Sequence, residues 1–227
     1  MTGTLLNVGA VLAGTLVGTL VGARLPQGLH DRVLAGLGLI TLVIGVDLAL
    51  AWRDTNALYV LGAVLVGGLL GEAARIEDRI AGLGDRLQRR TGGEGVSQAF
   101  FTASLLFCVG PLTVVGSIQD GLTGDFQALA TKSVLDGFAS IALAASLGPG
   151  VGFAAISVLV VQGGLTLGAG LFADVLREGS EPLAAMTSAG GVLIIGIALK
   201  LLDLKDVKVG NFLPALVLAP ALAAALA

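Results

Sequence analysis

Apolar segments of membrane-spanning length recur along the whole chain. They cover residues 3–23, 33–52, 57–73, 99–118, 126–147, 150–175, 183–202 and 209–227. Roughly 20 residues of α-helix cross the hydrocarbon core of a bilayer. Only 13% of the 227 residues are charged, whereas about a quarter are charged in a typical soluble domain. We therefore expect an integral membrane protein in contact with the lipid bilayer.

These segments predict helices rather than the strands of a barrel. Their apolar residues do not alternate with polar ones, and the segments are too long for barrel strands. No Lys or Arg precedes the first segment, so we expect a membrane helix there and not a cleaved signal peptide. The predicted fold class is all-α, a polytopic transmembrane helical bundle.

Basic residues are unequally divided between the two sides of this bundle. With the eight segments numbered as crossings, ten of the thirteen Lys and Arg residues fall on one side, and Arg53 and Arg177 fall on the other. Basic residues favour the cytoplasmic side, so both termini are expected outside the cytoplasm. A re-entrant hairpin at 99–147 gives the same division. The prediction is therefore eight crossings, or six plus a hairpin.

The predicted organisation is a single membrane domain with a polar interruption. A first three-helix unit covers 1–73, a central helix pair covers 99–147, and a second three-helix unit covers 150–227. Between the first two lies 74–98, whose apolar residues recur at helical spacing opposite its arginines. This pattern favours an amphipathic helix at the cytoplasmic membrane surface over a solvated linker.

A weak internal similarity relates the two three-helix units. Residues 15–48 align without a gap to 166–199, with eight identities that include Thr15 with Thr166. Copies so placed begin on opposite sides of the membrane. They would form an inverted-topology repeat around the central pair, an organisation that recurs among secondary transporters.

A helix break is predicted inside the segment 99–118. Pro111 removes a backbone donor, and Gly110 before it loosens the same turn. Such breaks are tolerated within a membrane where neighbouring helices or a water-filled cavity satisfy the freed carbonyls. Thr113 and Ser117, four residues apart, are candidates to line that cavity. A kink that serves packing alone is the alternative.

Two opposite charges lie well inside the apolar segment 126–147. Lys132 and Asp136 are four residues apart, so they share one helix face, together with Ser133 and Ser140. Each charge costs roughly 2.5–3.5 kcal/mol at the centre of a membrane helix. The pair is either structural, or Asp136 binds a proton or cation whose occupancy is coupled to transport.

Further polar residues lie in or beside the apolar segments. Asn7 and Asp47 fall within predicted membrane helices, as a polar clamp and as an intramembrane acid respectively. Gln119, Asp120 and Asp125 belong to a glycine-containing turn. If that turn lies at the membrane surface, its acids are solvated. If the hairpin is re-entrant, they lie at depth, where they can hold a cation.

Glycine spacing on the first helix predicts close packing. Gly14, Gly18 and Gly22 fall four apart, and Gly67 with Gly71 forms a shorter example. Small residues at this spacing let two helix backbones approach, within one chain or between two. A homodimer through these faces is one expectation.

Catalytic signatures are scarce in the sequence. No HExxH, GxSxG or P-loop motif occurs, His30 reads as a solvated loop residue, and Cys108 as a small buried apolar one. We expect no enzyme activity, no cofactor besides Na⁺ or H⁺ as a coupling ion, and no nucleic-acid partner. Metal binding by the site residues is left open.

Four motifs are the most informative in the chain: the opening GTLLNVGAVLAGTLVG, then CVGPLTVVGSIQDGL, KSVLDGFAS and GGVLIIGIALKLLDLK. Through them the chain resembles the DUF554 family of prokaryotic integral membrane proteins. The resemblance covers essentially the whole chain. It implies a multi-pass protein of the cytoplasmic (inner) membrane. It points to these residues: Asn7, Gly110, Pro111, Ser117, Gln119, Asp120, Gly121, Asp125, Lys132, Ser133, Asp136 and Ser140.

The leading hypothesis is an ion-coupled transporter or channel for a small solute or cation. Its site would combine the break at Gly110 and Pro111 with the Lys132 and Asp136 face. The alternative is a membrane scaffold without transport activity. A third hypothesis, an intramembrane enzyme acting on lipid, would depend on Asp120 and Asp125 as an acid–base pair.

Overall fold

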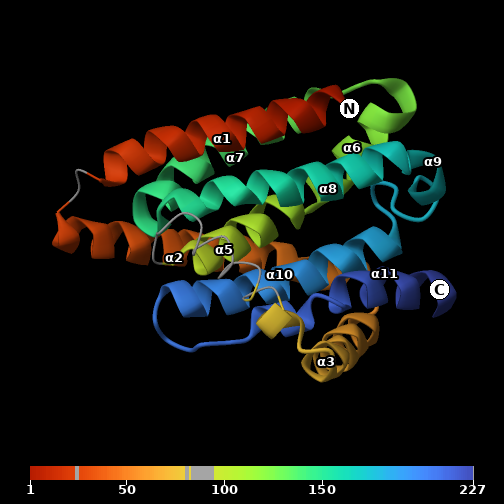
Figure 1. Cartoon of the computed structure of the whole chain (residues 1–227). Coiled ribbons are helices and arrows are strands. Elements are labelled where there is room, and N and C mark those ends of the chain that lie inside the picture. The colour runs from red at the N-terminus through yellow and green to blue at the C-terminus, as the bar shows by residue number, and fades with distance from the viewer. Residues whose placement is uncertain (24–25, 80–81, 83–94, 227) are drawn as a thin grey trace. The chain divides into compact units, whose positions relative to one another are not determined.

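The computed structural model describes residues 1–23, 26–79, 82 and 95–226, and every element among them is a helix (Figure 1). The helices are α1 (Thr2–Gly22), α2 (Gln27–Ala49), η1 (Leu50–Asp54), α3 (Ala57–Ala73), α5 (Val96–Cys108), α6 (Pro111–Thr123), α7 (Gln127–Leu147), η2 (Pro149–Phe153), α8 (Ala154–Leu167), α9 (Ala169–Phe172), α10 (Glu181–Leu201), η3 (Val209–Phe212) and α11 (Ala215–Leu226), where η marks a 3₁₀ helix. The predicted all-α class is confirmed.

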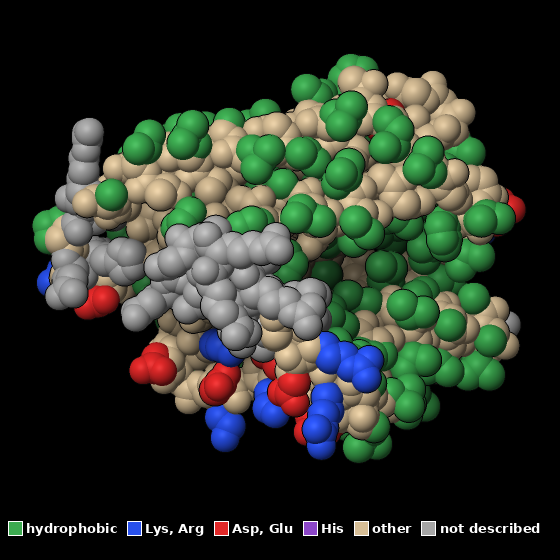
Figure 2. Space-filling view, viewed as in Figure 1, with side chains coloured by type: hydrophobic (Ala, Val, Ile, Leu, Met, Phe, Trp, Pro, Cys, Tyr) green, Lys and Arg blue, Asp and Glu red, His purple; other side chains and the backbone are tan. Residues whose placement is uncertain are grey.

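Most of these helices are suited to a bilayer. Six segments within the described residues are long and apolar enough to cross one: Thr2–Gly22, Asp31–Asp54, Gln127–Leu147, Pro149–Leu167, Glu181–Leu201 and Val209–Leu226. α5 and α6 together make one further segment with a bend of 62°, and α3 is apolar but has 17 residues. Figure 2 shows apolar side chains spread over α1 and α8. The chain is a multi-pass membrane protein.

The amphipathic helix expected at 74–98 falls mostly outside the described residues. Within that range only 74–79, 82 and 95–98 are described. The expectation for this segment stays a prediction.

Contacts divide the chain into two compact units. Unit 1 comprises Met1–Leu37, Ala81–Cys108 and Leu112–Phe172. Unit 2 comprises Gly38–Ile80, Val109–Pro111 and Ala173–Ala227. This grouping cuts across the three ranges expected from the sequence, and the division into two three-helix units around a central pair stays a prediction.

In unit 1, α1 and α7 run parallel and touch along much of their length (Figure 1). Gly14 lies against Gly137, and Gly22 lies against Ala145. A Cβ added at Gly14 would overlap the carbonyl oxygen of Gly137, so only glycine permits this approach. The glycines of the first helix therefore pack closely, as predicted, and their partner is α7 of the same chain.

α8 packs against α1 in the opposite direction. Met1 lies beside Gly163 near the end of α8, and Thr15 lies beside Gly152 just before α8 begins. The apolar core of unit 1 is made by α1, α5, α7, η2 and α8. Its buried residues are Val11, Ala99, Ala103, Phe107, Leu143, Ala144, Val151, Ala154, Ala155 and Val158.

The broken pair α5 and α6 runs from one end of unit 1 to the other. At the start of α5, Val96 lies against Gly150, which follows the end of α7. At the end of α6, Asp120 accepts a hydrogen bond from Gly3, at the start of α1. Because α1 and α7 are parallel, these two contacts lie at opposite ends of the unit. α5 and α6 are thus two halves of one lengthwise path.

Unit 2 contains two further antiparallel pairs. Gly45 of α2 lies against Ile195 of α10, whereas Gly38, earlier in α2, lies against Leu202. In the same way, α3 runs antiparallel to the segment formed by η3 and α11. The contacts that show this are Gly71 with Asn211, Gly68 with Phe212 and Gly67 with Ala215.

Charged side chains of unit 2 gather around the loop after α10 and the residues after α3 (Figure 2). There Lys200 pairs with Asp206 at 2.9 Å, and Lys208 with Asp78 at 3.8 Å. Polar groups of this kind belong in water or in the headgroup region. This end of unit 2 is therefore a membrane boundary.

Candidate functional site

α7 carries a buried ion pair. The ammonium group of Lys132 contacts Oδ2 of Asp136, and the two side chains are 8% and 9% exposed. The four-residue spacing places both on one helix face, as predicted. Removing one partner of a buried pair leaves an uncompensated charge, which costs about 3–5 kcal/mol. The pair is therefore held together as a neutral unit.

A residue from α1 completes this group. Nδ2 of Asn7 donates to Oδ2 of Asp136 at 2.8 Å, and Asn7 has no exposed area. A carboxylate can only accept hydrogen bonds, so the amide nitrogen of Asn7 must face it. The other amide atom, Oδ1, has no hydrogen-bond partner among the described residues. We call Asn7, Lys132 and Asp136 the polar triad.

The predicted helix break is present between α5 and α6. α5 ends at Cys108, and Gly110 has a φ of +148°, which L side chains rarely adopt. Thr113 satisfies one freed carbonyl, because its Oγ1 donates to the oxygen of Phe107 at 3.1 Å. Cys108, the last residue of α5, packs against the apolar core of unit 1. α6 begins at Pro111, whose side chain lies outside the described part of the structure.

The serines of the predicted polar face of α7 differ in their bonding. Ser133 donates to the carbonyl oxygen of Leu129 at 2.7 Å, so its hydroxyl is satisfied within the helix. Ser140 is fully buried, and its hydroxyl has no partner among the described residues. Ser140 therefore has hydrogen-bonding capacity to offer, whereas that of Ser133 is partly used.

Other buried polar atoms of unit 1, like the hydroxyl of Ser140, have no hydrogen-bond partner among the described residues. Leaving a hydroxyl or amide unpaired in an apolar interior costs about 1–3 kcal/mol by protein measurements. The atoms without a partner in the described part of the chain are Oγ1 of Thr4, Thr15, Thr19 and Thr166, Oγ of Ser117, Ser140 and Ser146, Oδ1 of Asn7, and both amide atoms of Gln162. So many in one unit call for a ligand or water.

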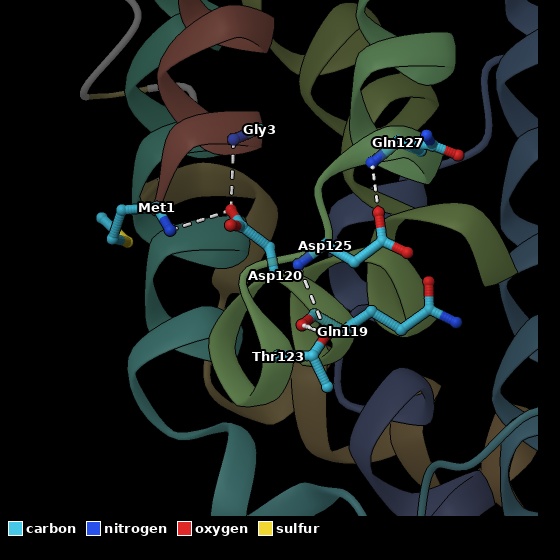
Figure 3. A network of polar contacts seen from close by, with 7 residues as sticks. All are labelled: Met1, Gly3, Gln119, Asp120, Thr123, Asp125 and Gln127. Atoms are coloured by element: carbon cyan, nitrogen blue, oxygen red, sulfur yellow. Dashed lines mark hydrogen bonds and ion pairs between the residues drawn. The ribbon is translucent and has the colours of Figure 1, made fainter.

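Asp120 is not part of the triad and contacts the start of α1 instead (Figure 3). Its carboxylate accepts from the backbone N–H of Gly3 at 3.1 Å and lies 2.9 Å from the amino group of Met1. A negative charge is favourable at a helix N-terminus, where backbone N–H groups are unpaired. Asp120 thus ties the end of α6 to the start of α1.

Asp125 and Gln119 lie at the surface of the same end (Figure 3). Oδ1 of Asp125 accepts from the backbone N–H of Gln127 at 3.0 Å, which satisfies one donor at the start of α7. The backbone oxygen of Gln119 accepts from Thr123 at 2.9 Å, and its side chain is exposed. Asp47 is also exposed, on α2. None of these three is brought to the triad.

The sequence matches, over residues 2–224, the family described as "Protein of unknown function (DUF554)". The chain belongs to the DUF554 family. Two relatives of the DUF554 chain are similar to it over nearly their whole length. "Uncharacterized membrane protein YdfK" of Bacillus subtilis (strain 168) is 30% identical over 225 residues, 97% of this chain and 94% of YdfK. "Uncharacterized protein YqgA" of Escherichia coli (strain K12) is 30% identical over 230 residues, 98% and 96% of the two chains. No solved structure matches the chain.

Two buried residues of this DUF554 protein were missed from the sequence. Thr4 and Gln162 have no exposed area, and their polar side-chain atoms have no partner among the described residues. Gln162 could have been found as a lone amide within the apolar segment 150–175, because uncompensated polar groups are costly there. Thr4 gives no such signal, since threonine is ordinary near a helix start.

The described residues of the DUF554 chain contain no group of three His, Cys, Asp or Glu side chains that could hold a metal ion. The polar atoms that gather in unit 1 are mostly hydroxyl and amide groups. Such groups suit water, a polar solute or an alkali cation.

Proposed function

We propose that this membrane protein is an ion-coupled transporter or channel for a small solute or cation, with its site at the polar triad and at the ends of α5 and α6 within unit 1 that flank the helix break. The observation that supports this function most directly is the buried pair of Lys132 and Asp136, which is bound to Asn7. Intramembrane charges in such positions are expensive, and they commonly mark ion or substrate pathways. Broken helices likewise supply unpaired backbone groups to substrates.

The unpaired groups around the triad favour this function over a purely structural pair. A pair kept for packing would gain from having its neighbours satisfied, since each unpaired buried group is costly. Oδ1 of Asn7 and the hydroxyl of Ser140 instead have no partner in the described chain. Both are next to Asp136, one across a hydrogen bond and one a helical turn along α7. They provide contacts for a transported species.

A route from the triad follows α1 and α7. Beyond Asn7, unpaired hydroxyls occur at Thr15 and Thr19 on α1. On α7 they occur at Ser140 and, near its end, Ser146. The parallel helices carry these groups toward the same end of unit 1. This series supplies hydrogen bonds to a dehydrated solute or ion along that direction.

The helix pairing supports an inverted repeat. The offset of 151 that aligns residues 15–48 with 166–199 places α1 on α8 and α2 on α10 when it is applied to the whole first unit, and α3 then falls on η3 and α11. The two members of each of these pairs pack against each other in antiparallel directions. Two copies related by a two-fold axis in the membrane plane give this arrangement, which underlies alternating access in many transporters.

The orientation in the membrane follows from the charge bias. Both termini lie outside the cytoplasm in a prokaryotic cytoplasmic (inner) membrane, with the turn between α6 and α7 on the same side as Met1. The loop after α10, which contains Lys205 and Lys208, lies inside. α5 and α6 form one broken crossing in this topology. The protein is not an enzyme, so ion or solute gradients supply the energy.

A flux assay tests the function. The full-length protein is reconstituted into liposomes, and uptake is measured across a panel of ions, pH gradients and small carboxylates. We expect flux above that of empty liposomes, and loss of it in Asp136→Asn. Asp125→Asn is the matched control, because this exposed carboxylate lies away from the triad.

The same assay can also reject the transport function. If the wild-type protein and Asp136→Asn are both folded, and neither exceeds empty liposomes for any solute, the transport function is rejected. The scaffold alternative would then account for the chain. A homodimer stays part of the proposal, but it needs surfaces other than the glycines already packed against α7 and α11.

A further inference from the structure

Gln162 is the least satisfied polar side chain of unit 1. It lies on α8 with no exposed area, and neither its Nε2 nor its Oε1 has a hydrogen-bond partner among the described residues. Water-to-hydrocarbon transfer of an unpaired amide is strongly unfavourable. A buried group of this kind in a native structure calls for a partner that binds there.

The packing of α1 against α8 brings Thr4 to the level of Gln162. Met1 lies beside Gly163 and Thr15 lies beside Gly152, so residue numbers rise on α1 as they fall on α8. Interpolation between these two contacts places Thr4 and Gln162 at the same height along the helix axes, to within one helical turn. Both side chains are fully buried, and the hydroxyl of Thr4 is also unpaired in the described chain.

The packing of α6 against α8 adds Ser117 to the same level. Gly121 lies against Thr166 and Ala169, and both helices run toward the end of unit 1 where α1 starts. One turn earlier on each helix are Ser117 and Gln162. Ser117 has no exposed area, and its hydroxyl has no partner among the described residues.

The side chain of Asn7 indicates whether the ligand is positively or negatively charged. It lies one turn beyond Thr4 on α1, and its Nδ2 is already used by Asp136. The atom it has left is Oδ1, a pure acceptor. An anion would be repelled by this oxygen, whereas a cation or a hydrogen-bond donor is attracted.

We propose that Thr4, Asn7, Ser117 and Gln162 bind a single dehydrated monovalent cation of the Na⁺ type through their side-chain oxygens. These oxygens come from α1, α6 and α8, and Asn7 connects them to Asp136. Hard cations select hydroxyl, amide and carboxylate oxygens. A divalent ion is disfavoured, because both nearby carboxylates are already paired, Asp136 with Lys132 and Asp120 with the amino group of Met1.

The cation changes the balance of the polar triad. A positive charge beside Asn7 competes with Lys132 for the field of Asp136. Occupancy of the site therefore loosens the contact between Lys132 and Asp136, and release of the cation restores it. Its role as the coupling ion rests on the proposed transport function, but the binding itself is measured without transport.

Binding is tested by thermal unfolding of the full-length protein in detergent. The midpoint Tm is compared in NaCl, KCl and choline chloride at equal ionic strength, since a ligand of the native state raises Tm. We expect Na⁺ at saturation to raise Tm by roughly 5 °C over choline. We expect Gln162→Leu to lose this shift, and its Tm in choline to equal or exceed the wild-type value.

Two further variants make the test specific. Ser117→Ala is expected to lose the Na⁺ shift as well, and it serves if Gln162→Leu does not fold. Ser104→Ala is the control: its hydroxyl is 2.8 Å from that of Ser157, within unit 1 but outside the proposed site. This control should keep the full shift.

The outcomes separate this site from the transport function. No Na⁺-dependent shift in the wild-type protein, or an unchanged shift in both Gln162→Leu and Ser117→Ala, overturns the site and leaves water as the occupant. A shift that follows these predictions in a protein without flux supports the site while the transport function fails.

Discussion

Asn7 and Asp136 lie 129 positions apart in the chain, yet a hydrogen bond of 2.8 Å joins the amide of one to the carboxylate of the other. This contact links the first helix to the helix that carries the ion pair. It also fixes which atom of Asn7 is free. Both the proposed transport site and the proposed cation site depend on it.

The balance of the ion pair predicts a recovery of stability in a double variant. Asp136→Leu alone leaves Lys132 buried without a counter-charge, and we expect a loss of about 3–5 kcal/mol in unfolding free energy. Adding Lys132→Met removes the stranded charge, so the double variant should regain most of the loss. Thermal unfolding in detergent measures both. Equal stability of the single and double variants would contradict a coupled buried pair.

The glycine contact between α1 and α7 predicts a steric penalty. In Gly18→Ala the new methyl group meets backbone atoms of Ile141, which cannot rotate away. We expect a loss of about 1–3 kcal/mol in stability. Gly9→Ala is the matched control, because a Cβ there meets nothing within 4 Å. If both variants lower Tm equally, the effect is not due to this contact.

The positive φ of Gly110 predicts strain in Gly110→Ala. Nothing lies within 4 Å of an added Cβ, so the cost comes from the backbone conformation and not from a clash. A non-glycine residue in such a region costs about 1–3 kcal/mol. We expect lower Tm and lower flux. Gly164→Ala, at an open helical position of α8, should leave both unchanged.

Asp120 is predicted to affect stability rather than flux. Asp120→Ala removes the acceptor for Gly3 and the partner of the Met1 amino group, so we expect a loss of about 1–2 kcal/mol by analogy with helix N-caps. The flux per folded protein should stay near the wild-type value. Proteoliposome uptake, normalised to folded protein, measures this. A complete loss of flux with unchanged Tm would return Asp120 to the transport site.

The orientation predicts where engineered cysteines react. In a Cys108→Ser background, Asp125→Cys should react with a membrane-impermeant maleimide added outside intact cells. Asp203→Cys, just after α10, should react only after the membrane is opened. The reverse pattern would invert the topology.

Local sequence was enough to predict the helices, the helix break and one contact of the candidate site. The helix break follows from the backbone chemistry of Gly110 and Pro111, and the pairing of Lys132 with Asp136 follows from helical spacing. Each depends on residues within a few positions of one another. Such relationships can be predicted before any long-range contact is known.

The remaining residues depend on how distant helices are aligned. Asp120 was a candidate ion ligand, and only the contact with the start of α1 shows its bonding. The sequence marks Gln162 as a lone amide in an apolar segment, but only the folded chain shows that both of its amide atoms are buried without a partner among the described residues. Helix alignment is a tertiary property, which no short motif encodes.

The backbone contact of α1 with α7 has a mechanical consequence. Glycines at 14, 18 and 22 bring main chain against main chain, with only the Cβ atoms of Ser140 and Ala144 beside two of them. Packed backbones resist sliding, so the two helices behave as one stiff strut. In the proposed transport function, the motion that opens the triad to water is therefore expected from the half-helices α5 and α6. The pair of α1 and α7 would hold Asn7 and Asp136 in place during that motion.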